Sequence, residues 1–396
     1  MNSIQEKDKI NKFIIAFGLA MYLKSPQIKH LINFVLSCLQ KDFNGKTTEI
    51  SELYTNERHR TSIARFFTES TWSEKLILSK MKKQCISKIK EYSSKTGKPV
   101  EVIVDDTISR KSKPSSKASN PIKSGGYHYS HTENKVVYGH QIVIVLVKCG
   151  NIQLPYDILL YEKGIESKVK IASKAIEEIG HYIDNAVVLA DNWYSGKNVI
   201  KTSVEAGFTY IGGIKTNRKI YPNGRKKGIQ IKGFARDLKA KDLNLVTVRG
   251  KRYYTYRYHG KIRGFKDVVI VITCPRGKFR NKKSLKAFIC TDVTKTTAEI
   301  LRCYSRRWSI ETFIHQSKSY LGLNGYQIRC KSGIKKFYIA VMLAYCYIAM
   351  SNQDCNFNKG LHAACKNAKI NMLEHIYYSG VANKPFSEVL SSFKIA

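Results

Sequence analysis

The sequence has no C-x-x-C pair, and it has no apolar run long enough to cross a membrane. Its ten cysteines stand singly, which argues against a zinc ribbon or a disulfide scaffold and is typical of a reducing compartment. The longest apolar stretch, 337–350, is shorter than the roughly 20 residues of a membrane helix and contains tyrosines. The first residues mix both signs of charge with no clear apolar segment after them, so we expect no signal peptide and a cytoplasmic protein.

Acidic residues are also scarce, with 30 Asp+Glu against 68 Lys+Arg and a net charge of +38. Such an excess repels itself in a compact chain unless a polyanion binds. Nucleic acid is the expected partner. A membrane surface is not, because no basic amphipathic helix stands apart from the rest of the sequence. The 396 residues exceed one small core and predict about two or three domains.

Residues 1–98 carry apolar side chains at helical spacing and predict a helical region. Arg58, Arg60 and Arg65 stand beside short helical segments. This pattern is typical of a helix-turn-helix-like DNA-binding region, so we expect these three arginines to contact DNA. The alternative is a plain helical bundle with one basic face.

Two β-branched runs end in acidic residues within the next segment, 99–214. The first run, 100–107, carries Asp106 near its end, and the second, 187–191, ends at Asp191. Both predict buried strands that present a carboxylate at their carboxyl end. The alternative is that each aspartate only shapes a turn.

Further elements lie between and after these two strands. The segments 136–149 and 152–161 predict a hairpin, 166–179 predicts a helix and 208–214 predicts another strand. Three strands, a helix and a strand with an acid at its tip is the order of an RNase H-like core. We therefore predict an α/β fold with an RNase H-like mixed sheet.

The segment 215–283 breaks this order with alternating, Lys- and Arg-rich stretches that predict an antiparallel β-rich insertion. Tyr254 and Arg257 lie where aromatic and basic residues interleave, and we expect them to contact DNA. The alternative places the tyrosines on a buried face. The second part of the core, 284–350, then follows, and 351–396 predicts a helical tail without a motif.

A helix with one polar face is predicted just after the insertion. Thr296 and Glu299 form a capping-box signature at its start. Arg307 and Glu311 are four residues apart, so a solvated helix with a simple ion pair is the alternative to a functional face. Four side chains fall on one arc of this helix: Tyr304, Arg307, Glu311 and Lys318.

Asp106, Asp191 and Glu311 are the candidate catalytic residues and metal ligands. Carboxylates from separate segments suit Mg²⁺, which prefers oxygen ligands, and we expect Mn²⁺ to substitute. Two such ions can promote phosphodiester hydrolysis and strand transfer by in-line displacement.

The spacing Y-(2)-R-(3)-E-(6)-K from Tyr304 to Lys318 resembles the signature of DDE transposases of the IS-four type. Residues 60–72 also resemble the N-terminal region of that family. The resemblance implies a helical DNA-binding region, an RNase H-like core and a β-rich insertion. It also implies that Tyr304, Arg307 and Lys318 contact DNA near the cut site.

The resemblance assigns the first acid to Asp106, which directly precedes Thr107, the second to Asp191 and the third to Glu311. Asp105 competes with Asp106 for the first position. Strand alternation puts the two aspartate side chains on opposite faces, so only one of them is expected to face the other acids.

The resemblance further implies cutting at inverted-repeat ends of double-stranded DNA, joining to target DNA and a homodimer in the paired-end complex. Well-studied members form a DNA hairpin, and a tryptophan of the insertion can hold a flipped base there. Trp72, Trp193 and Trp308 all lie outside the insertion of this chain.

Three other functions stay open at this point. One is an RNase H-like nuclease that cuts without joining, and another is a non-catalytic, transposase-derived DNA-binding protein. A basic RNA-associated protein would explain the charge but not the ordered acids. We expect the protein to be cytoplasmic and associated with the bacterial nucleoid.

Overall fold

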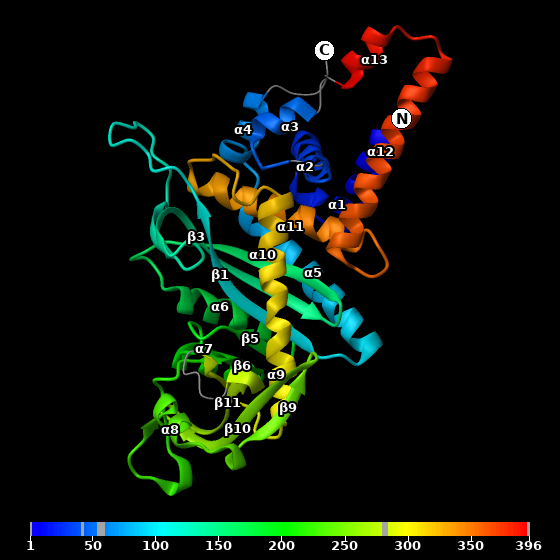
Figure 1. The fold of residues 1–396 in the computed structure, drawn as a ribbon. Helices are drawn as coiled ribbons and strands as arrows, with labels where there is room; N and C mark the ends of the chain where they lie inside the picture. The colour runs from blue at the N-terminus through cyan, green and yellow to red at the C-terminus, as the bar shows by residue number, and fades with distance from the viewer. Residues whose placement is uncertain (1, 41–42, 54–59, 279–283, 394–396) are drawn as a thin grey trace.

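The computed structural model describes residues 2–40, 43–53, 60–278 and 284–393 (Figure 1). Within these residues the strands join into one twelve-stranded mixed sheet. The mixed α/β fold class predicted from the sequence is confirmed. The strands are β1 (Val100–Arg110), β2 (Gly126–Ser130), β3 (Lys135–Cys149), β4 (Ile152–Tyr161), β5 (Ala186–Ala190), β6 (Thr209–Ile214), β7 (Lys219–Ile220), β8 (Ile229–Gln230), β9 (Asn244–Val248), β10 (Lys251–Ile262), β11 (Phe265–Pro275) and β12 (Lys286–Cys290).

Strand β1 lies inside the sheet, whose order is β2-β3-β1-β5-β6-β12-β11-β10-β7-β8, with β4 on β3 and β9 on β10. It runs antiparallel to β3 and parallel to β5. All five side chains of β5 are buried, as expected of a parallel strand covered on both faces. The predicted hairpin, 136–149 and 152–161, corresponds closely to β3 and β4.

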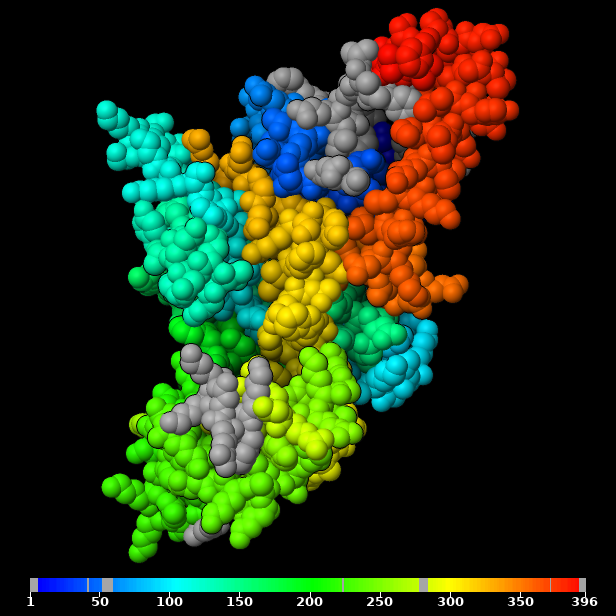
Figure 2. Space-filling model, in the orientation of Figure 1, coloured from blue at the N-terminus to red at the C-terminus, as the bar shows by residue number. Residues whose placement is uncertain are grey.

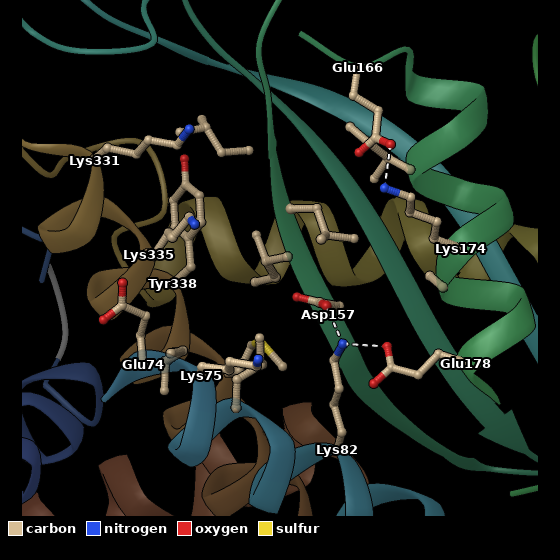
Figure 3. A pocket seen from close by; sticks show the side chains of 18 of the residues that line it. Glu74, Lys75, Lys82, Asp157, Glu166, Lys174, Glu178, Lys331, Lys335 and Tyr338 are labelled. Atoms are coloured by element: carbon tan, nitrogen blue, oxygen red, sulfur yellow. Dashed lines mark hydrogen bonds and ion pairs between the residues drawn. The ribbon is translucent and has the colours of Figure 1, made fainter. Parts of the chain in front are cut away.

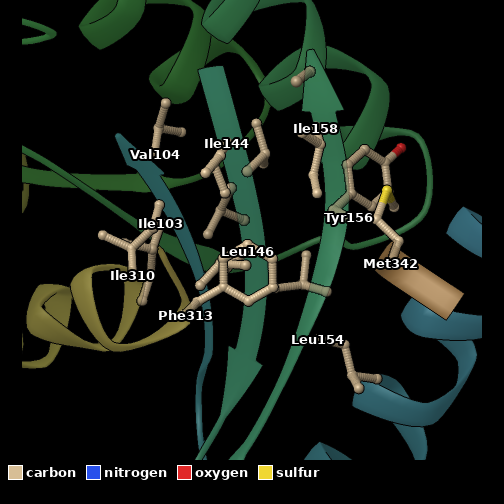
Figure 4. Packing of buried hydrophobic residues seen from close by; sticks show 14 of the residues in the cluster. Ile103, Val104, Ile144, Leu146, Leu154, Tyr156, Ile158, Ile310, Phe313 and Met342 are labelled. Atoms are coloured by element: carbon tan, nitrogen blue, oxygen red, sulfur yellow. The ribbon is translucent and has the colours of Figure 1, made fainter. Parts of the chain in front are cut away.

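Helices cover both faces of this sheet. Figure 4 shows Ile310 and Phe313 packed against Ile103 and Leu146, and all four side chains are buried. The helices are α1 (Asn2–Ala16), α2 (Ser25–Cys38), α3 (Thr47–Leu53), α4 (Arg60–Thr68), α5 (Glu74–Thr96), α6 (Lys168–Gly180), α7 (Lys197–Glu205), α8 (Ile231–Asp237), α9 (Thr297–Ser305), α10 (Ser309–Tyr320), α11 (Lys331–Met350), α12 (Phe357–Val381) and α13 (Phe386–Phe393).

The N-terminal region contains helices α1–α5, the helical content that the apolar spacing predicts. Arg60 begins α4, while the predicted DNA contact Arg58 lies outside the described residues. Among the described residues, one helix, α11, is long and apolar enough to cross a membrane, but 89% of its most apolar window is buried inside the protein. It is therefore a core helix of this fold.

The segment 215–283 continues the core sheet. Strand β11 pairs with β12, and β12 pairs with β6, so the added strands extend the sheet that carries the core. The short helix α8 within this segment was not predicted. Figure 1 shows these strands together at the end of the molecule opposite α12 and α13.

The helix predicted around Tyr304 is interrupted. The α-helix α9 ends at Ser305, a 3₁₀ turn spans Arg306–Trp308, and α10 resumes at Ser309. Its start is as predicted, because the Thr296 hydroxyl accepts from the Glu299 amide and the Glu299 carboxylate accepts from the Thr296 amide. The 3₁₀ turn therefore carries Arg307, one member of the predicted polar face.

Candidate active site

Arg307 joins two carboxylates that come from different elements. One guanidinium nitrogen lies 2.8 Å from Asp105 Oδ2 on β1, and the other lies 2.5 Å from Glu311 Oε1 on α10. The Arg307–Glu311 ion pair expected for an i,i+4 spacing is present, and the same guanidinium also pairs with Asp105. The structure thus brings Glu311 beside Asp105, the rival of Asp106.

Asp191 directly follows β5, the parallel neighbour of β1. Its Oδ1 accepts hydrogen bonds from the backbone amides of Trp193 and Tyr194 at 2.8 and 3.3 Å. Burial raises the pKa of Asp191, and the nearby charge of Asp106 raises it further while Arg307 lowers it. Asp191 therefore lies within electrostatic reach of both sides of this cluster.

Asp106 faces away from Arg307 and has its own partners. The Lys168 ammonium lies 3.0 Å from its Oδ2 and the Tyr194 hydroxyl donates to its Oδ1 at 2.9 Å. The Gln141 amide donates to Oδ2 as well. Three donors from α6, β3 and the segment after β5 thus hold this carboxylate.

The charge environment of Asp105 differs from that of an ordinary surface aspartate. Burial raises its pKa to about 7, and the Asp191 charge adds to this while Arg307 opposes it. Like charges near a buried carboxyl disfavour its ionised form. Asp105, Asp191 and Glu311 with one guanidinium make a local excess of negative charge that a cation would relieve.

Tyr304 borders a hollow of about 660 Å³ that Asp191 also lines. Three lysines, Lys215, Lys232 and Lys286, line the same hollow. Burial raises the pKa of the Tyr304 phenol, so it is a neutral donor at ordinary pH. The hollow next to Asp191 therefore combines a hydroxyl donor with cations.

Lys318 lies on the same side of β1 as Asp105. Its ammonium donates to Thr107 Oγ1 at 2.7 Å and to the Ile108 carbonyl at 2.8 Å. Burial lowers its pKa to about 8. In this arrangement Lys318 fastens α10 to β1, and any contact with DNA would need a different rotamer.

Trp308 does not have the place that the helical pattern predicts. On a regular helical wheel of about 100° per residue, Trp308 would fall with Leu301 on an apolar strip beside the polar face, but the Trp308 side chain is 62% exposed. The 3₁₀ turn changes the angular spacing at this point, because it has three residues per turn instead of 3.6. The apolar side chains of Leu301, Ile310 and Leu321, which flank the polar face, are all buried.

The other predicted DNA contacts are distributed away from the acids. The Arg257 guanidinium donates to the carbonyls of Val293 and Lys295 at 2.8 Å each, so it holds the loop before α9. Tyr254 is half-buried on β10. Arg60 is exposed, and Arg65 is exposed and pairs with Glu69 at 3.4 Å.

Three residues beside the acids were not singled out from the sequence: Lys168, Tyr194 and Trp193. The Trp193 side chain is 52% exposed, and the ammonium groups of Lys168 and Lys215 lie 4.7 and 5.4 Å from its ring centre. The run Asn-Trp-Tyr after Asp191 was a usable signal, since residues directly after a strand end share its edge. No sequence pattern pointed to Lys168, because this residue begins α6 and meets Asp106 only through the tertiary packing of that helix against the sheet.

A second hollow of about 730 Å³ lies between α5, β4, α6 and α11 (Figure 3). On its wall the buried Lys82 ammonium contacts Asp157 at 2.6 Å and Glu178 at 2.7 Å. None of the predicted catalytic acids lines this hollow. The ion pairs join α5, β4 and α6, which is a structural role.

The acids suit a divalent ion by chemistry. Carboxylate oxygens are the ligands that Mg²⁺ prefers, and the surplus negative charge at Asp105, Asp191 and Glu311 favours a cation. Among the described residues no three His, Cys, Asp or Glu side chains are grouped closely enough to hold a metal. Arg307 instead spans Asp105 and Glu311.

The sheet and the acidic cluster define an α/β protein with a carboxylate-bearing candidate site at the edge of β1 and β5. Residues 96–347 match the family described as the transposase DDE domain, and the chain belongs to this family. Members of this family generally use divalent metal ions. A search of curated proteins found no match.

One solved structure similar to this chain is the piggyBac transposase synaptic complex with hairpin DNA, determined by cryo-electron microscopy. The two share 10% sequence identity with a TM-score of 0.48, over 93% of this chain and 79% of the other.

Proposed function

We propose that this protein is the transposase of an insertion sequence of the IS-four type, with an RNase H-like core. It would cut double-stranded DNA at inverted-repeat ends and join them to target DNA. The family match over residues 96–347 carries this proposal. The spacing Y-(2)-R-(3)-E-(6)-K from Tyr304 to Lys318 supports the finer assignment.

Asp105, Asp191 and Glu311 are the proposed acidic set, with Asp106 as the rival for the first position. The geometry favours Asp105, because Arg307 bridges it to Glu311 and the charge of Asp191 acts on it. The family resemblance favoured Asp106 instead, because Asp106 directly precedes Thr107. Substitution of each aspartate separately decides between them.

These acids would hold the Mg²⁺, or the Mn²⁺ that replaces it, only after Arg307 releases Asp105 and Glu311. Bound at the acids, the ions supply Lewis-acid activation of the attacking oxygen and charge neutralisation at the phosphate. The protein's own contribution is positioning. Asp105 and Glu311 are oriented by Arg307, while Asp191 is fixed by the amides of Trp193 and Tyr194.

The cations around the acids would orient the substrate. Arg307 has a permanent charge and a fork of donors that fits phosphate oxygens, so it could exchange a carboxylate for a phosphate when DNA binds. Lys215, Lys232 and Lys286 beside Asp191 offer further phosphate contacts. The N-terminal arginines and Tyr254 stay proposed contacts farther along the DNA.

A homodimer in a paired-end complex is proposed for the active assembly, since joining two ends of one element needs two sites. The protein would act where the chromosomal DNA lies, in the bacterial cytoplasm and nucleoid.

Cleavage of labelled DNA tests the proposal. Inverted repeats flanking the gene are end-labelled and incubated with the protein and Mg²⁺ or Mn²⁺, with Glu311→Gln as the control. Metal-dependent cuts at the repeat ends, followed by joining to a target plasmid and absent in the control, are expected. Cutting without joining would support the nuclease, and binding with no cuts under either metal would support the non-catalytic protein.

A further inference from the structure

Beyond the acids, β1 leads into a projecting hairpin. The chain leaves β1 at Arg110, passes through a loop and returns as β2 and β3. Figures 1 and 2 show this hairpin, in cyan, standing out from the body of the protein. Strand β2 and the hairpin that it forms with β3 were not predicted from the sequence.

A groove of about 470 Å³ lies where the hairpin meets the end of β1. Four cations line it, Arg110, Lys111, Lys113 and Lys135, and none of the described residues that line it is acidic. Glu133 lies nearby, 3.1 Å from Arg110 and 3.1 Å from Lys135. These five side chains leave a surplus of positive charge at the groove.

Lys111 differs from the other cations of this groove because its ammonium is already bound to backbone carbonyls. Its ammonium donates to the carbonyls of Asn324 and Tyr326 at 2.7 Å each and lies 3.4 Å from the centre of the Tyr326 ring. It therefore fixes the groove to the segment after α10. Lys113 is exposed and Lys135 has only an exposed ion pair, so these two can turn toward a ligand.

Exposed aromatic side chains stand on the hairpin beside these cations. Tyr127 is 57% exposed and Tyr129 is 50% exposed. The Lys113 ammonium lies 5.9 Å from the centre of the Tyr127 ring, which packs edge-on against Tyr138. Exposed aromatics between cations are typical of nucleic-acid surfaces, where rings pack on sugars and bases and cations contact phosphates.

The position of the groove relative to the acids sets its distance from the cut. Arg110 lies five positions after Asp105 on the same strand. At about 3.3 Å per residue this is roughly 17 Å, or about five base pairs of B-form DNA at about 3.4 Å each. A duplex that runs along β1 from the acids would therefore pass the groove within half a helical turn.

We propose that this groove and hairpin bind the phosphate backbone of duplex DNA about five base pairs from the acidic cluster. The position relative to the cut rests on the proposed function, whereas the binding of duplex DNA does not. A phosphate backbone fits better than an acidic protein, because the groove lies in line with the strand that carries the acids.

Salt-dependent binding tests the proposal without knowledge of the transposon ends. A fluorescein-labelled 30-base-pair duplex of random sequence is titrated with the full chain from 50 to 200 mM KCl, and anisotropy gives the binding constant. The Lys113→Gln/Lys135→Gln variant should lower the slope of log K against log salt by about 1.8, since each lost phosphate contact contributes about 0.9. Glu133→Gln should tighten binding, because it removes the acid that competes with phosphate.

The control is Lys366→Gln/Lys369→Gln on α12. It removes the same charge from two exposed lysines far along the sequence from the hairpin. It should leave the slope at the wild-type value. Equal slopes for the wild type and both double variants would overturn the proposal, as would an equal loss of slope in both.

The two proposals can fail independently. If the slope falls only in the hairpin variant but no DNA end is ever cut, the groove stands and the transposase function fails. If ends are cut while both variants bind like the wild type, the function stands and the groove fails. Once an end is mapped, a methylphosphonate placed five base pairs from the cut should weaken wild-type binding and leave Lys113→Gln/Lys135→Gln unaffected.

Discussion

Asp105 and Asp106 are adjacent in the sequence, yet they lie in different environments on the two faces of β1. Asp105 shares Arg307 with Glu311 and is affected by the charge of Asp191. Asp106 is held by one ammonium, one hydroxyl and one amide. Asp105 thus belongs to a group of acids in which negative charges outnumber the cations that pair with them. Asp106, in contrast, already accepts hydrogen bonds from three donors.

The proposed functional acid differs from the structural one in how far its charge is already compensated by its neighbours. An ion pair supplied with enough donors gains little from a further cation. A group of like charges is held at an electrostatic cost that a bound cation can offset. The face of β1 that carries Asp105 has this second character.

The largest expected effect is on DNA cleavage. Asp105→Asn should reduce the cleavage rate by about a thousandfold or more, because loss of a metal ligand removes several kcal/mol of transition-state stabilisation and each 1.4 kcal/mol is tenfold. Asp106→Asn should reduce it far less, since its donors can still hold an amide oxygen. Single-turnover cleavage of a labelled end measures both rates.

If Asp106→Asn instead caused the larger loss of cleavage, Asp106 would be the first acid. The ion pairs of Arg307 with Asp105 and Glu311 would then not mark the catalytic residues. Thermal unfolding of both variants serves as the control, because a variant that fails to fold would lose cleavage for another reason.

The second prediction concerns the stability of the Asp105 face. Arg307→Met leaves Asp105 and Glu311 without their shared partner and should lower the free energy of unfolding by about 2 kcal/mol, the typical value for hydrogen bonds to charged groups. Adding Asp105→Asn should recover part of the loss, because the unpaired charge is then gone. Urea unfolding of the two single variants and the double variant measures this coupling.

Strictly additive losses in that cycle would mean that Arg307 and Asp105 do not interact in solution. Lys168→Met is the matched substitution on the opposite face, and its cycle with Asp106→Asn reports the same coupling for the other aspartate.

The third prediction tests the neutral donor on the Asp106 face. Tyr194 is buried and donates its hydroxyl to Asp106 Oδ1. Tyr194→Phe should lower the free energy of unfolding by about 1 kcal/mol, the usual contribution of one hydrogen bond. In the Asp106→Ala background, which leaves no side-chain oxygen to accept the hydroxyl, the loss should shrink, and an undiminished loss would show that the hydroxyl acts through another group.

The sequence contained much of this site, because two of its signals are local. Asp191 is placed by the apolar run that ends beside it. Glu311 is singled out by its spacing from Tyr304, Arg307 and Lys318. Strand alternation correctly separated Asp105 from Asp106. It could not say which face meets α10, since that depends on the packing of a helix about 200 residues away in the chain.

The missed features depend on tertiary contacts in the same way. The 3₁₀ turn at Arg306–Trp308 exposes Trp308 and aims Arg307 at β1, which a regular helical wheel cannot predict. Arg257 looked like a phosphate ligand among tyrosines, but its guanidinium binds two backbone carbonyls near α9. A side chain's type predicts the chemistry it can perform, whereas the partner it meets decides its role.

The smallest expected effect is on the pH dependence of stability, and it concerns Lys318, which contacts β1 on the same face as Asp105. Burial lowers the pKa of Lys318 to about 8, below the value of about 10.4 in an unfolded chain. Between these values the unfolded chain binds more protons than the folded one, so Lys318 makes the free energy of unfolding rise with pH. Below pH 8 both states are protonated and the contribution is constant.

Lys318→Met removes this term, so the stability difference between wild type and variant should grow as pH rises from 8 to 10. The growth should stay at about 1 kcal/mol or less, because solvent still reaches part of the side chain. Urea unfolding at pH 7, 8, 9 and 10 measures it. A difference that stays constant over this range would mean that the ammonium is solvated and free. Lys318 would then be available to contact DNA near the cut site, as the family resemblance implies.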